Sequence, residues 1–241
     1  MINVEDYIKK QIAVFQANER LEHRERRPGR GKEGGLFYGP YLLISREKGA
    51  GGKTVAQLVG SRLGWQVFDH EIVDEIAKKA NVRRQLIESL DERDRATIQD
   101  IIGQLLNPQE IGTASYLDCL KQVVLTLGHH GDVVIVGHGA RFILPDQFGF
   151  SVRMVAPIQA RIRRIAVKAR LNLEAARVEV ERIDRERVKL VRRHFGHDVT
   201  DPLSHDLIIN TAAISVEAAA EVVITALQRK LGVRIKESGR K

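Results

Sequence analysis

Short apolar segments alternate with longer segments of helical periodicity over most of the chain after Pro40. Continuous short apolar runs are typical of strands buried on both faces, and apolar residues three or four positions apart are typical of helices packed on a sheet. This alternation predicts an α/β domain in which helices cover both faces of a parallel five-stranded sheet. The expected strands are Tyr41–Ser45, Gln66–Phe68, Asp132–Gly137, Ser151–Ala156 and Asp206–Asn210. The expected helices are Thr54–Leu63, Glu71–Ala80, Arg95–Leu106, Ser115–His129, Pro157–Ala169, Leu173–Phe195 and Val216–Leu231.

The N-terminal part of the chain has a different pattern. Apolar residues such as Ile8, Ile12 and Phe15 recur at helical spacing, and arginines dominate the following positions. This pattern predicts an amphipathic helical arm over residues 1–27. Residues 28–40 are rich in glycine, with proline at both ends, and are interpreted as a linker. The arm either packs on its own domain or on a second subunit, or its basic face contacts another partner or a membrane surface.

Composition narrows the class of protein. The 241 residues suit one α/β domain with appendages, and no apolar run approaches the ~18 residues of a membrane span. A single cysteine, Cys119, and an N-terminus without a signal-like apolar run predict a cytoplasmic protein. The net charge of +8 favours polyanionic ligands such as nucleotides. Only 5% of residues are aromatic and none lies in an interleaved basic–aromatic patch, so no specific nucleic-acid binding is expected.

A glycine-rich segment joins the first expected strand to the first expected helix. Small residues let the backbone surround a phosphate group, with several N–H groups directed inward at a helix N-terminus. Lys53 would add a positive charge, and Thr54 would offer a hydroxyl to a magnesium ion carried by the nucleotide. The segment departs from the G-x-x-x-x-G-K-[ST] pattern because Glu47 stands where the first glycine belongs. The residues expected to hold the nucleotide here are Arg46, Gly49, Ala50, Gly51, Gly52, Lys53 and Thr54.

Four segments occur in the order ISREKGAGG (44–52), VVIVGHGA (133–140), VRMVAPIQARIRRI (152–165) and FGHDVTDPLSHDLIINT (195–211). Together they resemble the successive signatures of the cytidylate kinase-like family. The resemblance implies a P-loop nucleoside-monophosphate-kinase fold for residues 41–241, with an acceptor-binding helical part at about 69–130 and a lid at about 170–200. It also implies ATP and Mg²⁺ as cofactors, and transfer of the γ-phosphoryl group to CMP or dCMP.

Two positions differ from the better-known cytidylate kinases. Lys53 stands one place later than their loop lysine, because Gly52 occupies that position. His138 and Gly139 stand where those enzymes carry an Arg-Asp pair that holds the acceptor, and Arg141 follows. Two functional hypotheses therefore stay open: a kinase acting on a small acceptor, and a P-loop nucleotide-binding regulatory protein with weak or no catalytic activity.

The lid region is rich in arginine. Phosphoryl transfer depends on charge neutralisation, and guanidinium groups bind phosphate oxygens in pairs. On a helical wheel, Arg182 and Arg185 share one stripe, whereas Arg187 lies on the apolar stripe with Asp184 beside it. The alternative is a solvated helix with many salt bridges. The resemblance implies catalytic roles for Lys53, Arg182, Asp184, Arg185 and Arg187, and nucleotide contacts for Arg161 and Arg164.

Three residues are candidates for the acceptor side. Asp69 either orients the acceptor or caps the helix that begins at Glu71. His138 follows a strand at the edge where ligands bind open α/β sheets, or is a structural histidine. Arg141 is the third candidate. No cysteine or histidine spacing predicts a zinc site, so magnesium is the expected metal. The apolar helix Thr97–Leu106 either completes the core or forms a homo-oligomer interface.

Overall fold

The computed structural model describes residues 4–22, 31–33, 36–105 and 116–233. Five parallel strands form the central sheet in the spatial order β4-β5-β3-β6-β7. The predicted five-stranded parallel sheet is therefore confirmed, with boundaries shifted by a few residues. The strands are β3 (Tyr41–Arg46), β4 (Gln66–Phe68), β5 (Val133–Val136), β6 (Gly149–Val155) and β7 (Leu207–Asn210).

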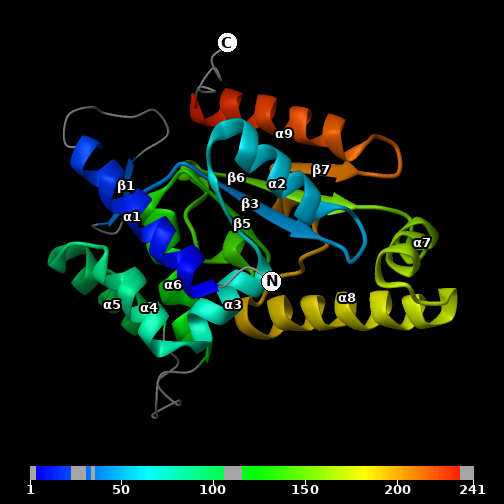
Figure 1. Cartoon of the computed structure of the whole chain (residues 1–241), viewed down its shortest axis with the longest axis horizontal. Helices are drawn as coiled ribbons and strands as arrows, with labels where there is room; N and C mark the ends of the chain where they lie inside the picture. The colour runs from blue at the N-terminus through cyan, green and yellow to red at the C-terminus, as the bar shows by residue number, and fades with distance from the viewer. Residues whose placement is uncertain (1–3, 23–30, 34–35, 106–115, 234–241) are drawn as a thin grey trace.

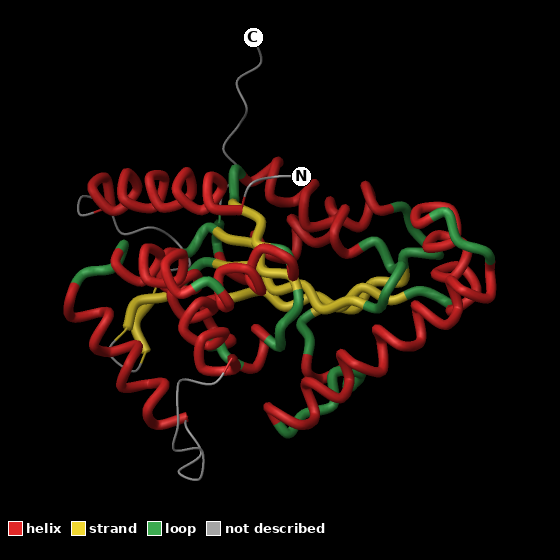
Figure 2. The backbone as a smooth tube through the Cα atoms, turned by 60° about the horizontal axis from the view of Figure 1, so that its bottom comes forward, coloured by secondary structure: helices red, strands yellow, loops and turns green. Residues whose placement is uncertain are grey.

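Helices cover both faces of the sheet, as Figure 2 shows with the strands between two layers of helix. Alternate residues of a strand point to opposite faces, so Leu42 and Ile44 pack in one core and Tyr41 and Leu43 in the other. The first core includes α2 (Gly52–Leu63) and α9 (Val216–Leu231). The second includes α3 (His70–Lys78), α4 (Ala80–Glu88), α5 (Glu92–Leu105) and α6 (Tyr116–His130).

Two further helices extend beyond the sheet and form the right-hand side of Figure 1. They are α7 (Ile158–Ala169) and α8 (Leu173–Phe195), and they pack on each other through Ile162, Ile165 and Val180. Asn172 caps α8 by accepting a hydrogen bond from the Ala175 amide at 2.8 Å. The α7–α8 pair therefore projects as a helical hairpin at the carboxyl edge of the sheet.

The acceptor-side helices differ from the sequence prediction at one point. The structure ends α3 at Lys78, and Lys79 takes an extended conformation before α4 begins at Ala80. The sequence pattern predicts no helix at Ala80–Glu88, because only two buried positions, Val82 and Leu86, mark its apolar face. In α5, Ile98 and Ile102 are buried in the chain's own core. The predicted ends at Leu106 and Ser115 lie outside the described residues.

The N-terminal helix α1 (Val4–Glu22) is confirmed, and it forms part of the core. Ile8 is fully buried, and the Phe15 ring stacks on the His130 ring at a centroid distance of 4.1 Å. The Tyr7 hydroxyl donates a hydrogen bond to the Val67 carbonyl at 2.9 Å. The apolar face of α1 is thus packed on the chain's own domain. A role of its basic residues in binding a partner or a membrane stays a prediction, and residues 23–30 lie outside the described part.

The segment interpreted as a linker contains an antiparallel hairpin. Its strands are β1 (Gly31–Glu33) and β2 (Leu36–Tyr38). Leu36 and Tyr38 are buried, and the Tyr38 ring stacks on Phe148 at 5.8 Å. The expectation of a linker is therefore wrong for these residues, because two large apolar side chains fix the glycine-rich segment to the core.

Membrane insertion through a spanning helix has no support in the described residues, where every helix is too short or too polar to cross a bilayer.

The packing of α1 gives a stability prediction. Phe15→Ala removes a ring that is 4% exposed, so we expect the free energy of unfolding to fall by about 3–5 kcal/mol. Val14→Ala is the matched control, because Val14 is 42% exposed on the same helix and should cost less than about 0.5 kcal/mol. Urea unfolding of both variants measures the difference. Equal effects would show that α1 does not pack on the domain.

Candidate functional site

The loop between β3 and α2 has a backbone that requires glycine. Gly49 and Gly51 have φ angles of +84° and +78°, in the left-handed region. A Cβ atom on Gly49 would lie 2.8 Å from the Arg161 carbonyl oxygen, and one on Gly52 would lie 2.8 Å from Cβ of Arg46. Gly49 and Gly51 are therefore needed for the turn, Gly49 also for close packing against α7, and Gly52 for close packing against β3.

Three carbonyl groups of this loop are fixed by side-chain hydrogen bonds. Side chains from α7 and from the residue after β7 donate hydrogen bonds to three successive carbonyls. These bonds are Arg161 to Lys48 at 3.2 Å, Arg164 to Gly49 at 3.3 Å and Thr211 to Ala50 at 3.0 Å. Arg164 also donates to the carbonyl and hydroxyl of Thr211, at 2.6 and 2.9 Å, so the two side chains support each other.

The amide groups of the same loop are the available donors. Within the described residues, the N–H groups of Gly49, Gly51, Gly52 and Lys53 have no hydrogen-bond acceptor. The last two open α2, where a helix leaves its first N–H groups without an internal partner and carries a partial positive charge. Several free amides at a helix N-terminus form an anion-binding site. The loop therefore fits the phosphate groups of a nucleotide.

Glu47 explains how the loop tolerates its departure from the usual motif. Its Oε2 atom accepts a hydrogen bond from the Ala156 amide at 3.1 Å and lies 3.2 Å from Nε of Arg161. Its own amide donates to the Met154 carbonyl at 3.0 Å. The carboxylate is thus bonded at the start of α7, where the guanidinium group of Arg161 balances its charge.

Lys53 connects the loop with the acceptor side. Its Nζ atom lies 2.7 Å from Oδ2 of Asp69 and 3.4 Å from Glu71. The hydrogen bond to Asp69 raises the pKa of Lys53. Burial would raise the pKa of Asp69, but the bonds from Lys53 and from the Ile72 and Glu71 amides outweigh it and lower that pKa. Asp69 therefore caps α3, one of its two expected roles, and its contact with an acceptor stays a prediction.

Helix α8 brings two of the four predicted lid residues to the loop. Asp184 accepts a hydrogen bond from the Lys48 amide at 2.7 Å and pairs with Arg161. Arg187 donates to the Arg46 carbonyl at 3.1 Å and lies 3.6 Å from Asp184. The remaining two, Arg182 and Arg185, are exposed on another side of α8 and pair with glutamates of their own helix. The structure does not gather the three arginines at one point.

A pocket lies at the carboxyl ends of β3, β5 and β6, beside α8. Three of its lining residues are arginines that lie close enough to perturb one another: Arg46, Arg153 and Arg187. Burial and the charge of Arg187 lower the pKa of Arg46 to about 9, and burial also lowers the pKa of Arg153 and Arg187. Crowded and partly buried guanidinium groups of this kind are typical of an anion site.

Arg153 is a site residue that the sequence analysis missed. It lies within β6, is 6% exposed and donates a hydrogen bond to the Ser45 hydroxyl at 2.9 Å. The sequence does carry a signal for it, because an arginine inside an apolar strand is rarely buried without a partner or a role. The family signature VRMVAPIQARIRRI contains it, but the resemblance implies nucleotide contacts only for arginines after the strand.

The other predicted residues take mixed positions. His138 is buried after β5, and its Nε2 atom lies 3.1 Å from the His70 carbonyl. Burial and the neighbouring His70 lower the pKa of His138 to about 4. Arg141 lines the pocket but is bonded to the Ser204 carbonyl at 2.9 Å and to Asp146. Thr54 is exposed in the first turn of α2, beside Lys53.

A glycine loop at the N-terminus of α2, a central β3 and the strand order β4-β5-β3-β6-β7 define a P-loop kinase fold. The chain belongs to the cytidylate kinase-like family, whose model matches residues 42–213. It is 27% identical to the cytidylate kinase of Ignicoccus hospitalis over 184 residues, which cover 76% of this chain and 95% of the relative. It is 28% identical to that of Staphylothermus marinus over 185 residues, covering 76% and 93%.

A solved structure has the same fold. An uncharacterised protein of Eubacterium ventriosum superposes with a TM-score of 0.63 at 18% identity, covering 78% of this chain and 98% of the other. The family match begins at residue 42, so α1 and the β1–β2 hairpin lie outside it.

Gly49→Ala tests the geometry of the loop. Gly64→Ala serves as the matched control, because Gly64 has a φ of +70° and the same backbone strain, but a Cβ atom there would meet no neighbouring atom within 4 Å. Gly49→Ala should unfold at lower denaturant than Gly64→Ala, and its affinity for ATP should fall by at least about tenfold. Equilibrium unfolding and calorimetric titration with ATP measure both effects. Equal behaviour of the two variants would contradict the close packing of Gly49 on α7.

Proposed function

We propose that this protein is an ATP- and Mg²⁺-dependent kinase that transfers the γ-phosphoryl group to a small acceptor, CMP or dCMP. The observation that carries the proposal is the loop at Gly49–Lys53, whose free amides open α2 next to a pocket lined by Arg46, Arg153 and Arg187. A site for a triphosphate and a second anion site side by side suit phosphoryl transfer between two phosphate-bearing molecules.

The acceptor would occupy the arginine pocket. A nucleoside monophosphate carries a phosphate that Arg153 and Arg187 can bind in pairs of hydrogen bonds. Both arginines sit on packed elements, β6 and α8, so they would hold the acceptor at a fixed distance from the loop. The choice of CMP is supported by relatives that are named cytidylate kinases. The chain matches them over nearly the whole of their own length.

The chain's own residues would position the phosphate groups and neutralise their negative charge. The loop amides would hold the β- and γ-phosphates, and Lys53, on a half-exposed side chain, would move from Asp69 to the phosphates. Arg187 would neutralise charge on the transferred group, since it already contacts Arg46, the last residue of β3 before the loop. Thr54 would face the magnesium ion, which neutralises the phosphate oxygens when bound with the nucleotide.

Two contacts of the loop favour the second hypothesis, a regulatory nucleotide-binding protein. In this structure Lys53 pairs with two carboxylates, and Asp184 accepts the amide hydrogen of Lys48 in the loop. A chain that keeps these contacts with nucleotide bound would bind ATP without turning it over. Turnover measurements separate the two hypotheses.

The acceptor is tested with ATP, Mg²⁺ and a panel of nucleoside monophosphates and small alcohols. We expect ADP to form only when an acceptor is added, fastest with CMP or dCMP. Lys53→Gln should lower kcat/KM for the best acceptor by about 10²–10³-fold, because it removes a positive charge that would stabilise the transition state. Lys168→Gln is the control, since Lys168 is exposed on α7 and should change kcat/KM less than twofold. ATP binding without turnover on any acceptor would exclude the kinase.

The two sides of α8 give a further prediction. Arg187→Lys keeps the charge but loses the planar fork, so kcat should fall by about tenfold or more. Arg185→Lys changes an exposed residue that pairs with Glu181, and its kcat should stay within about twofold of wild type. Steady-state kinetics on both variants measure the two values of kcat. A larger loss in Arg185→Lys than in Arg187→Lys would show that α8 presents its other side during turnover.

A further inference from the structure

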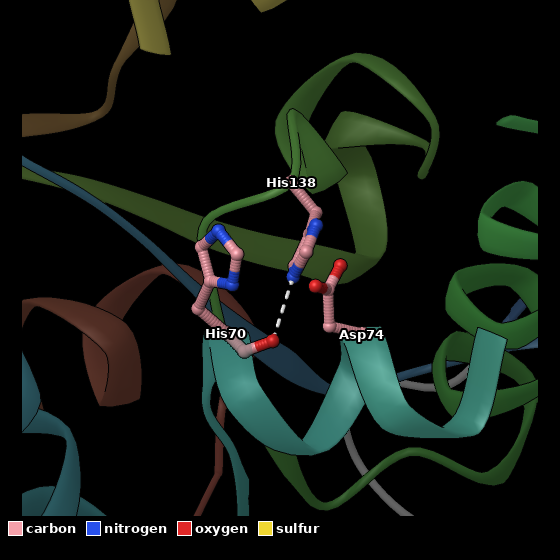
Figure 3. Close-up of side chains that lie close together, drawn as sticks. All are labelled: His70, Asp74 and His138. Atoms are coloured by element: carbon pink, nitrogen blue, oxygen red, sulfur yellow. Dashed lines mark hydrogen bonds between the residues drawn. The ribbon is translucent and has the colours of Figure 1, made fainter. Parts of the chain in front are cut away.

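Three side chains of metal-ligating type meet beside the pocket: His70 and Asp74 on α3, and His138 after β5. One ligand atom from each lies within 4.8 Å of both others. Figure 3 shows His70 and Asp74 rising from the same helix face, with the His138 ring between them. No local sequence pattern predicts this group, because His138 lies far along the chain from His70 and Asp74.

The backbone places each of the three side chains. His70 and Asp74 are four residues apart on α3, so they share one face of the helix. His138 has a φ of +59°, between Gly137 at +94° and Gly139 at +67°. A left-handed conformation is uncommon for a residue other than glycine and is often associated with function. This sharp turn directs the His138 ring towards α3.

Hydrogen bonds fix the Asp74 carboxylate, and the two histidine rings contact each other. Asp74 accepts hydrogen bonds from the Tyr116 hydroxyl and from Nζ of Lys78, the latter at 2.9 Å. The rings of His70 and His138 lie 4.3 Å apart between centroids. Metal-binding carboxylates and imidazoles are commonly fixed by hydrogen bonds from neighbouring residues in this way.

We propose that His70, Asp74 and His138 bind a divalent transition-metal ion of the zinc class. Two imidazole nitrogens and one carboxylate oxygen form a donor set that suits zinc, and three protein ligands leave a further position open. Magnesium prefers oxygen ligands, so this ion would be distinct from the one expected with the nucleotide. Because His70 and His138 line the pocket, an anionic oxygen of the pocket's ligand could take the open position.

Small movements would complete the site. Tetrahedral bonds of about 2.0–2.1 Å place zinc ligands roughly 3.3 Å apart, closer than the 4.8 Å limit within which these atoms now lie. His70 is exposed, so its ring is free to rotate inward. For Nε2 of His138 to bind the ion, its hydrogen bond to the His70 carbonyl must break and the ring proton must reside on Nδ1. The ring stays neutral in both tautomers, so no proton is lost.

The test uses the full chain without an affinity tag, freed of metal with a chelator and then titrated with Zn²⁺ by calorimetry. We expect one Zn²⁺ per chain, with Co²⁺ at the same site giving the visible absorption of a low-coordinate ion. His70→Gln and Asp74→Asn should each lower Zn²⁺ affinity by more than tenfold, and MgCl₂ should not compete. His194→Gln removes an exposed histidine of α8 and should leave binding unchanged.

Thermal melts of the metal-free variants control for folding, and the exposed position of His70 makes His70→Gln the decisive variant. Absence of stoichiometric Zn²⁺ binding by the wild-type chain would overturn the proposal. Binding that persists with wild-type affinity in both ligand variants would also overturn it, because the ion would then lie elsewhere. Neither readout depends on kinase activity, so failure here leaves the proposed kinase untouched.

Discussion

The structure of the glycine loop between β3 and α2 depends on the ion pairs of one buried arginine. Arg161 lies 3.2 Å from Glu47, donates to the Lys48 carbonyl and pairs with Asp184 of α8. Without this cation, the carboxylates of Glu47 and Asp184 would lie next to the loop with no guanidinium group between them. A charge that is removed from a partly buried network leaves its partners without compensation. The loop, α7 and α8 therefore adopt their arrangement together.

The order of the strands places the glycine loop and the arginine pocket side by side. Parallel strands present their carboxyl ends at one edge of the sheet, and ligands of open α/β sheets bind there. β3 leads into the glycine loop, while β6 contributes Arg153 and β5 leads to His138. Residues far apart in the sequence thus meet because neighbouring strands end together, and α8 lies across them through Asp184 and Arg187.

The sequence predicts those features that are encoded by nearby residues. Apolar runs located all five strands, and the glycines before Lys53 located the loop. The helical wheel separated Arg187 from Arg182 and Arg185, yet the resemblance assigned all three to one site, because family roles do not specify which side of a helix faces inward. Helix α4 was missed because its apolar stripe is narrow. The meeting of His138 with α3 depends on the strand order, which no local pattern encodes.

The packing of α1 has a consequence for how the chain acquires its fold. Phe15 is synthesised before its ring partner His130, which belongs to α6 and follows more than 100 residues later. Contacts between distant parts of a chain close slowly, because loop entropy must be overcome before they form. The apolar face of α1 is therefore left exposed while the sheet and α6 are still incomplete, and exposed apolar surface of this kind favours aggregation during folding.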